Sequence, residues 1–394
     1  MGTCGKGKNG KPGCPISYFQ AQVRSCVDYA TLQKRKGARI VGFLCEYTPR
    51  EIIMAAGGVP VCLCGGSAAM VEPAEKILPS NLCPLIKSTF GFSMGKENPF
   101  LEMADLLVAE TTCDGKKKMY ELLSETRPMH VLELPQKVDD ADSFERWVVE
   151  LEKFRAVLEK RFSTRITREK LRDAIRVLNR DRRLKRGLAA LMKAQEPPLT
   201  GRELLAMRSQ ISGMESDLEQ YEKALRMLPG RRLSPAASSR VRVLLTGVPL
   251  PHGAERVMDL IEGSGGLVVC QENCTGLKPV LDDVDEEARD PIRALAEKYF
   301  HLPCSVMTRN EARLDRIQAL AREYRAQCVI ELVWQACITY DVESRLVKRL
   351  AEEGLGLPYL KITTDYSPSD SSRIVLRVQS LFETVRGRAC STRE

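Results

Sequence analysis

The spacing of hydrophobic residues changes twice along this chain. From residue 39 to residue 147, short apolar runs of strand length alternate with segments of helical period. From about residue 142 to residue 231, apolar residues such as Leu151, Phe154 and Leu158 recur at three- and four-residue steps, which is typical of long amphipathic helices. The strand–helix alternation then returns for the rest of the chain. Such alternation favours parallel sheets that helices cover on both faces.

These patterns predict strands, helices and four regions. The predicted strands are Ile40–Leu44, Val59–Cys64, Leu106–Glu110, His130–Leu134, Val241–Thr246, Leu267–Cys270, Val329–Val333 and Tyr359–Ile362. Helices are expected near Tyr18–Lys34, Pro49–Ala56, Ala74–Leu78, Pro99–Ala104, Lys116–Ser124, Ala254–Glu262, Ile292–Tyr299, Asn310–Tyr324 and Val342–Glu352. The expected regions are an N-terminal arm and helix (1–38), a first α/β domain (39–147), a helical segment (148–235) and a second α/β domain (236–394).

The two α/β regions resemble each other in sequence. GGVPVCLCGG (57–66) is similar to GGLVVCQENCTG (265–276), and VAETTCDGKKKMYE (108–121) parallels IELVWQACITYDVES (330–344). Each region repeats a strand, a cysteine at the strand's exit and then a helix. We therefore predict a duplicated α/β unit with a helical insert between the copies.

Composition indicates a soluble protein of more than one domain. The chain has 394 residues, 43% of them hydrophobic, and no apolar run is long enough to span a membrane. The N-terminus has no apolar signal region, so the cytoplasm is the expected location. Residues 5–11 imitate a phosphate-binding loop, but Pro12 stands where Ser or Thr is required and no strand precedes, so we reject a nucleotide site there.

The net charge of +8 is concentrated between Arg155 and Arg186. Aromatic residues are not interleaved with these basic residues, which argues against nucleic-acid binding. The stretch is interpreted as a solvated helix face or as a docking face for an acidic partner.

Fourteen cysteines in a cytosolic chain favour metal or redox chemistry over disulfides, although some are expected to be plain core residues. Six lie at strand exits or proline turns: Cys45, Cys83, Cys113, Cys274, Cys304 and Cys337. If the two α/β units face each other, these thiols meet in one cleft. Convergent cysteines fit zinc or an iron–sulfur cubane, and the long spacings favour a cluster held between domains. Pro84 is expected to prevent a helix at Cys83, and Asp114 to cap the helix after Cys113.

Long phrases carry a family resemblance. They are CEYTPREIIMAAGGVPV (45–61), LPSNLCPLIKS (78–88), ETTCDGKKKMYE (110–121), ENCTG (272–276), QACITYDVES (335–344) and TDYSPSD (364–370). Together they resemble the 2-hydroxyacyl-CoA dehydratase superfamily, most closely its double-cubane cluster proteins, over nearly the whole chain from about Arg39. The resemblance implies two Rossmann-like (flavodoxin-like) parallel-sheet domains in pseudo-repeat, with iron–sulfur chemistry at their interface.

The resemblance also implies ligands for the cluster. Cys83, Cys113 and Cys337 match the ligands of one cubane, and Cys45, Cys274 and Cys304 match those of a second. The division into two triplets is open, with Cys64 and Cys270 as substitutes, and the roles of Cys4 and Cys14 are open too.

Two functions follow from the resemblance. The first is an iron–sulfur protein with a double-cubane 8Fe-9S cluster that reduces small substrates at low potential. The alternative is a subunit of an (R)-2-hydroxyacyl-CoA dehydratase, with a 4Fe-4S cluster, that works by a ketyl radical. Both imply a separate ATP-hydrolysing iron–sulfur reductase as electron donor, and the first implies a homodimer. A third hypothesis, from another class, is a binding module with structural zinc.

The other polar candidates are few. His252 follows a strand exit and is a candidate proton donor, whereas His130 and His301 are interpreted as structural. The remaining candidates, Glu46, Glu331 and Gln335, flank the cysteines or their strands and are interpreted mainly as residues that hold loops in place.

Overall fold

The structure is a computed structural model, and it describes residues 14–233 and 239–391. The phosphate-loop-like segment 5–11, Cys4 and the first part of the predicted N-terminal arm lie outside the described residues. The rest of that arm forms α1 (Pro15–Gln20) and α2 (Gln22–Arg35), which confirms the predicted helix.

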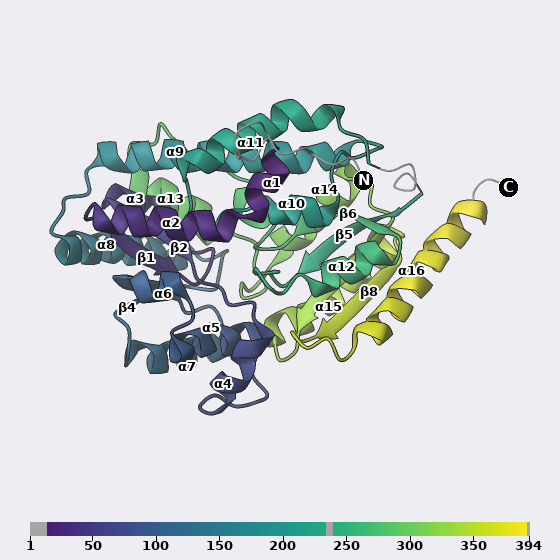
Figure 1. The fold of residues 1–394 in the computed structure, drawn as a ribbon, viewed down its shortest axis with the longest axis horizontal. Helices are drawn as coiled ribbons and strands as arrows, with labels where there is room; N and C mark the ends of the chain where they lie inside the picture. The colour runs from purple at the N-terminus through teal and green to yellow at the C-terminus, as the bar shows by residue number, and fades with distance from the viewer. Residues whose placement is uncertain (1–13, 234–238, 392–394) are drawn as a thin grey trace.

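Two four-stranded parallel sheets organise the molecule (Figure 1). The first has the order β2-β1-β3-β4 and the second the order β6-β5-β7-β8, so the strands of the two sheets are arranged in the same spatial order. The strands are β1 (Arg39–Phe43), β2 (Gly58–Cys62), β3 (Leu106–Glu110), β4 (Met129–Leu132), β5 (Val241–Gly247), β6 (Gly266–Glu272), β7 (Cys328–Trp334) and β8 (Tyr359–Thr364). The predicted α/β fold with two parallel sheets, and each predicted strand, are confirmed.

Continuous apolar runs explain why these segments form central strands. In β3 and β7 every residue is buried, as expected for parallel strands covered on both faces. Residues of β1 and β3, such as Ile40 and Leu107, belong to the same buried cluster as Val243 of β5 and Ile330 of β7. The half of the molecule around the β1–β4 sheet (the first half) and the half around the β5–β8 sheet (the second half) therefore share one core.

Helices surround both sheets. Those of the first half are α3 (Arg50–Ala55), α4 (Val71–Glu75), α5 (Pro84–Gly95), α6 (Pro99–Met103) and α7 (Asp114–Ser124). Those of the second half are α12 (Arg256–Gly263), α13 (Pro291–Phe300), α14 (Glu311–Glu323), α15 (Ile338–Arg349) and α16 (Ser371–Ser391). Among the described residues, no helix has the length and apolar character needed to cross a membrane.

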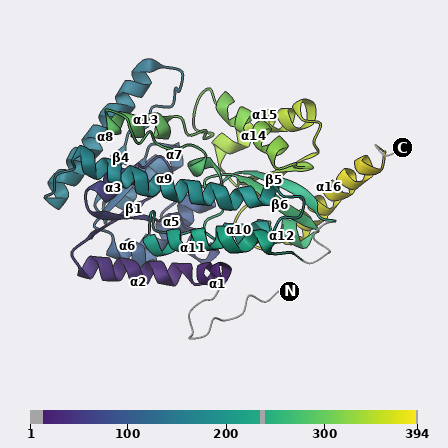
Figure 2. The same cartoon turned by 90° about the horizontal axis from the view of Figure 1, so that it is seen from above.

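The predicted helical segment consists mainly of α8 (Ala141–Phe162), α9 (Arg168–Ala190), α10 (Gly201–Ala206) and α11 (Glu215–Met227). The side chains of Asp140 and Thr167 accept hydrogen bonds from backbone N–H groups in the first turns of α8 and α9, which fixes where these helices begin. Helix α9 runs along the molecule and packs on α3 of the first half and α13 of the second (Figure 2). The exact domain limits remain a prediction.

Three local features differ from the prediction. Pro84 keeps Cys83 out of a helix, as expected, but it also starts the unpredicted helix α5, because proline suits the first helical position, where its missing N–H is not needed. Asp114 is the first residue of α7, and Cys113, not Asp114, occupies the cap position. The C-terminal helix α16 was not predicted at all.

Candidate functional site

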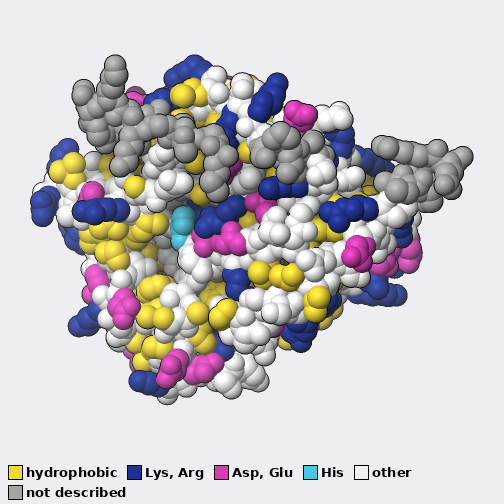
Figure 3. Space-filling view, turned by 45° about the vertical axis from the view of Figure 1, so that its right-hand side comes forward, with side chains coloured by type: hydrophobic (Ala, Val, Ile, Leu, Met, Phe, Trp, Pro, Cys, Tyr) yellow, Lys and Arg dark blue, Asp and Glu magenta, His cyan; other side chains and the backbone are white. Residues whose placement is uncertain are grey.

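A cavity of about 770 Å³ lies between the two halves. All six predicted cysteines line it: Cys45, Cys83, Cys113, Cys274, Cys304 and Cys337. Cys62, Cys64 and Cys270 line it as well. Figure 3 shows one face of the molecule, where hydrophobic side chains gather around a hollow beside a histidine side chain. The structure thus brings together thiols that are far apart in the sequence.

Close contacts join the two halves of the molecule. Gly66 has to be a glycine here, because a Cβ atom on it would lie 2.2 Å from the backbone oxygen of His252. The hydroxyl of Tyr366 donates to the backbone oxygen of Gly65 at 3.0 Å, and that of Tyr47 donates to Leu302 at 2.9 Å. These contacts fix the two sets of cysteines relative to each other.

Cys83, Cys113 and Cys337 each occupy the cap position at the start of a helix, namely α5, α7 and α15. The thiol of Cys83 accepts hydrogen bonds from the N–H groups of Leu85 and Ile86. Backbone N–H groups in the first turn of α7 and of α15 likewise bond to the thiols of Cys113 and Cys337. Helix N-termini stabilise negative charge, so these N–H groups lower the pKa values of the three thiols, but burial raises the net pKa of Cys113 and the hydrogen bond with Cys83 raises that of Cys337.

These same three residues form a group, which we call the first triplet. The thiols of Cys83 and Cys337 are hydrogen-bonded to each other, which lowers the pKa of Cys83. Cys113 interacts electrostatically with both, and also with Cys304. Burial raises the pKa of Cys113, and the neighbouring Lys116 opposes that rise.

Cys45, Cys274 and Cys304 form the second triplet. Cys45 interacts electrostatically with the other two, which also interact with each other. Burial raises the pKa of Cys274 to about 12, against the opposing effect of Lys278, and burial raises the pKa of Cys45 as well. Unless a bound metal ion or cluster stabilises their negative charge, these buried thiols stay protonated.

The donor set suits a polynuclear cluster better than a single ion. Among the described residues, no three His, Cys, Asp or Glu side chains are arranged to hold one metal ion. The six thiols are instead spread around a cavity with room for a larger group. Iron–sulfur clusters are held by thiolates, and this is the ligand type that the cavity supplies.

The polar candidates differ in position. Glu46 lines the cavity and accepts a hydrogen bond from Arg50 at 2.5 Å. Glu331 and Gln335 do not line it: Glu331 is fully buried against Arg313, and Gln335 is exposed. His130 stacks on Phe154, and the Nδ1 atom of His301 lies 2.9 Å from the backbone oxygen of Glu297 on its own helix.

His252 lines the cavity, as the prediction of a donor requires, but its surroundings hold it neutral. Burial and the nearby Arg208 and Arg202 lower the pKa of His252 to about 3. The Nε atom of Arg208 donates to Nε2 of His252 at 3.2 Å. A neutral imidazole in this position could donate only from Nδ1, so His252 cannot act as an imidazolium acid near pH 7.

We expect His252 to make the protein less stable in acid. Its folded-state pKa lies below the value of about 6.5 in an unfolded chain, so the unfolded chain takes up the proton first and stability falls as the pH drops from about 6.5. Replacing it by His252→Gln, whose oxygen can still accept from Arg208, should stabilise the protein by about 2 kcal/mol more at pH 5 than at pH 8. Guanidinium unfolding at both pH values measures this.

His301→Gln is the matched control, because it removes a histidine outside the cavity. If the difference between His252→Gln and the unmodified protein were the same at both pH values, His252 would not be held neutral.

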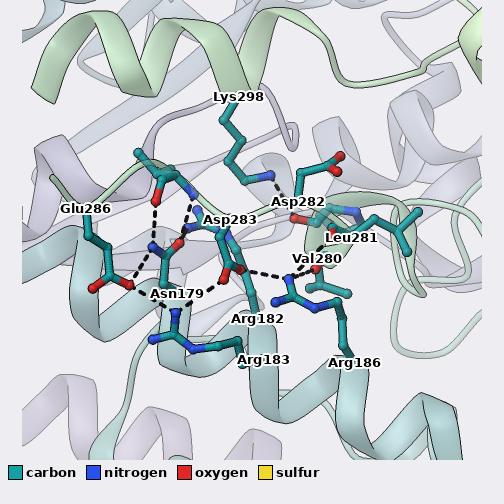
Figure 4. Close-up of polar contacts among 12 residues, drawn as sticks. Asn179, Arg182, Arg183, Arg186, Val280, Leu281, Asp282, Asp283, Glu286 and Lys298 are labelled. Atoms are coloured by element: carbon teal, nitrogen blue, oxygen red, sulfur yellow. Dashed lines mark hydrogen bonds and ion pairs between the residues drawn. The ribbon is translucent and has the colours of Figure 1, made fainter. Parts of the chain in front are cut away.

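The basic stretch between Arg155 and Arg186 is partly used inside the molecule (Figure 4). Arg183 pairs with Asp283 and Glu286, and Arg186 pairs with Asp283 at 2.7 Å. Arg186 also donates to the backbone oxygen of Val280, which lines the cavity. This part of α9 therefore holds the loop that follows Cys274, and it is less available to a partner than the sequence indicates.

Sequence reasoning missed two basic residues of the cavity, Lys116 and Arg208. Lys116 could have been found from helix phase, because it lies three residues after Cys113 and so returns to the same side of α7. Arg208 gives no comparable signal, because the loop after α10 reaches the cavity only through tertiary packing.

Comparison with known proteins identifies the family. The family model described as 2-hydroxyglutaryl-CoA dehydratase, D-component, matches residues 45–385. The chain belongs to this dehydratase family. The putative dehydratase subunit YjiM of Escherichia coli (strain K12) is 40% identical over 358 residues, which cover 89% of this chain and 92% of that protein.

More distant relatives of this dehydratase-family chain have related names. The (R)-phenyllactyl-CoA dehydratase beta subunit of Clostridium sporogenes is 22% identical, over 89% of this chain and 93% of that protein. The beta subunit of (R)-2-hydroxyglutaryl-CoA dehydratase of Acidaminococcus fermentans is 21% identical, over 94% of this chain and 98% of that protein. The predicted family resemblance is confirmed, as is the prediction that the chain is an enzyme component.

Proposed function

We propose that this dehydratase-family chain holds a double-cubane 8Fe-9S cluster and reduces small substrates at low potential. Cys83, Cys113 and Cys337 would hold one cubane, and Cys45, Cys274 and Cys304 the other. The observation that carries the proposal is that six thiols from both halves of the chain line one cavity. Electrostatic interactions within each set of three support the division into two triplets. When bound, the cluster would supply single electrons at low potential.

The protein's own residues prepare this chemistry in three ways. The N-termini of α5, α7 and α15 direct N–H groups at the first triplet and favour its thiolates. The apolar wall, which includes Trp334, Val248 and Leu205, limits water around the cavity. Neutral His252 and the Glu46–Arg50 pair provide polar groups that can orient a small substrate.

The alternative is a subunit of an (R)-2-hydroxyacyl-CoA dehydratase with one 4Fe-4S cluster. It is favoured by the relatives, which are named as dehydratase subunits. The second triplet disfavours it, because one cubane with an open iron needs only three thiolates.

Anaerobic purification with iron and acid-labile sulfide analysis separates these functions. The proposal requires about eight irons per chain, whereas the dehydratase alternative requires about four. A colourless protein that contains zinc and no iron would overturn both and support a structural zinc site.

We further propose a homodimer that receives electrons from a separate ATP-hydrolysing iron–sulfur reductase. Arg165 and Arg168, in and after the turn between α8 and α9, are exposed and have no carboxylate partner within the described parts of the chain. They are the best remaining candidates for a docking face in the basic stretch.

Replacing both, as Arg165→Gln with Arg168→Gln, should slow association with the reductase several-fold at low salt and much less at high salt. Reductase-dependent turnover at limiting reductase measures this. Arg176→Gln is the control, because Arg176 is equally exposed but already paired with Asp173. Equal rates for all three proteins would exclude this face.

A further inference from the structure

One positively charged side chain in the cavity wall has no carboxylate partner. Lys116 lies in the first turn of α7, three residues after Cys113, and it is half-buried. Its ammonium group donates to the backbone oxygen of Leu44 at 3.1 Å. Among the described residues it forms no ion pair, although an ammonium group has three N–H donors.

The neighbouring lysines show that this arrangement is specific to one position. Lys117 pairs with Asp114 at 2.8 Å, Lys118 pairs with Glu121, and both lysines are exposed. Of these three consecutive lysines, Lys116 is the one for which the described residues provide no carboxylate partner.

A buried lysine near the cavity, which does not line it, is balanced differently. Lys278, close to the second triplet, lies 3.4 Å from Glu272 and donates to the hydroxyl of Tyr340 at 2.8 Å. Its charge is therefore already matched within the protein, whereas that of Lys116 is not.

Thiols surround Lys116 where a carboxylate would be expected. It interacts electrostatically with Cys45 of the second triplet, with Cys113 of the first and with Cys64. Glu110 also interacts electrostatically with Lys116, but this carboxyl group bonds to Thr48 and forms no ion pair with the lysine. A partly buried charge without a counter-ion is energetically unfavourable, so an anion bound in the cavity would stabilise Lys116.

We propose that Lys116 is the counter-ion of the bound cluster and raises its reduction potential by facing a ligand of each triplet. This inference rests on the proposed function. A fixed positive charge in a medium of low dielectric constant stabilises the more negative, reduced state. Lys116 acts here as a positioning and charge-balancing residue, not as a proton donor.

The test is an EPR-monitored redox titration of anaerobically purified protein without substrate, with iron counted in the same samples. Lys116→Met keeps the length of the side chain but removes the charge. It should make one-electron reduction at least tenfold less favourable, which corresponds to a potential about 59 mV more negative. Lys116→Arg should restore most of the difference, and Lys118→Met, on the exposed side of α7 and outside the cavity lining, should leave the potential unchanged.

Each outcome decides the question. A fully loaded Lys116→Met protein with an unchanged potential overturns the proposal, even if its KM rises, because the lysine would then serve the substrate. If Lys116→Met holds little iron, the Arg variant decides: retention by Lys116→Arg supports a role of charge, and loss in both variants shows a role in packing and overturns it. If the unmodified protein binds no iron, the proposed function fails and this inference fails with it.

Discussion

Replacing Cys337 with alanine is expected to remove at least half of the bound iron and to abolish reductase-dependent activity. Cys337 is the ligand that, in our proposal, the second half contributes to the first triplet, and its thiol is hydrogen-bonded to that of Cys83. Changes in the residues that merely support metal ligands cost about 10–100-fold in metal affinity or activity, so loss of a ligand should cost at least as much. Iron per chain and the visible absorption of the cluster measure the effect.

Cys328→Ala is the matched control. Cys328 is fully buried in β7 but lies outside the cavity, so its replacement removes a sulfur atom from the core and leaves the triplets complete. It should keep its iron and lose about 1 kcal/mol of stability. Cys64→Ala and Cys270→Ala should also keep their iron. Iron loss in either of these variants, with retention in Cys45→Ala or Cys274→Ala, would mean that the second triplet is wrongly assigned.

Arg313→Met is expected to destabilise the protein by about 3–5 kcal/mol at neutral pH. Arg313, in α14, is fully buried. It pairs with Glu343, lies 3.4 Å from Glu272 and 3.3 Å from Glu331, and donates to Thr246 at 2.9 Å. Without the guanidinium group, the carboxylates of the two buried strands and of α15 would face one another uncompensated. Guanidinium unfolding at pH 7.5 measures the loss.

The pH dependence of this loss has a defined sign. Burial already raises the pKa of Glu331, and Arg313 opposes that rise. In the variant the folded-state pKa of Glu331 should lie further above its unfolded value, so protonation favours the folded state. The destabilisation should therefore shrink as the pH falls from 7.5 towards 5.

Arg316→Met, one turn further along α14, provides the comparison. Arg316 forms a solvent-exposed pair with Asp282 at 2.7 Å, and its loss should cost less than about 1 kcal/mol at either pH. Equal effects of the two substitutions would show that the buried network contributes no more than a surface ion pair.

The strands could be predicted from the sequence because the physical signal is local. Leu106–Glu110 was predicted with its exact limits, because a short apolar run between polar turns fits few structures other than a buried strand. The duplication was also visible in the sequence, and the identical strand order of the two sheets agrees with it.

Features that depend on tertiary packing were not predictable. Pro84 can end one helix or begin another. Here it begins α5, because Leu85, Ile86 and Phe90 are buried when this segment is helical. Lys116, Lys117 and Lys118 cannot be told apart by residue type. Their different roles depend on which face of α7 meets the cavity, and the cavity exists only when the two halves have packed together.

Each triplet takes its members from both halves of the chain. The first triplet has two cysteines from the first half and one from the second half, and the second triplet has one from the first half and two from the second half. A growing polypeptide therefore holds no complete set of ligands until synthesis has passed Cys304, and it completes the other set only at Cys337. A chain that stops after the first sheet would hold Cys45, Cys83 and Cys113 without their partners from the second half. Assembly of the proposed cluster would therefore have to wait until nearly six-sevenths of the chain has been made.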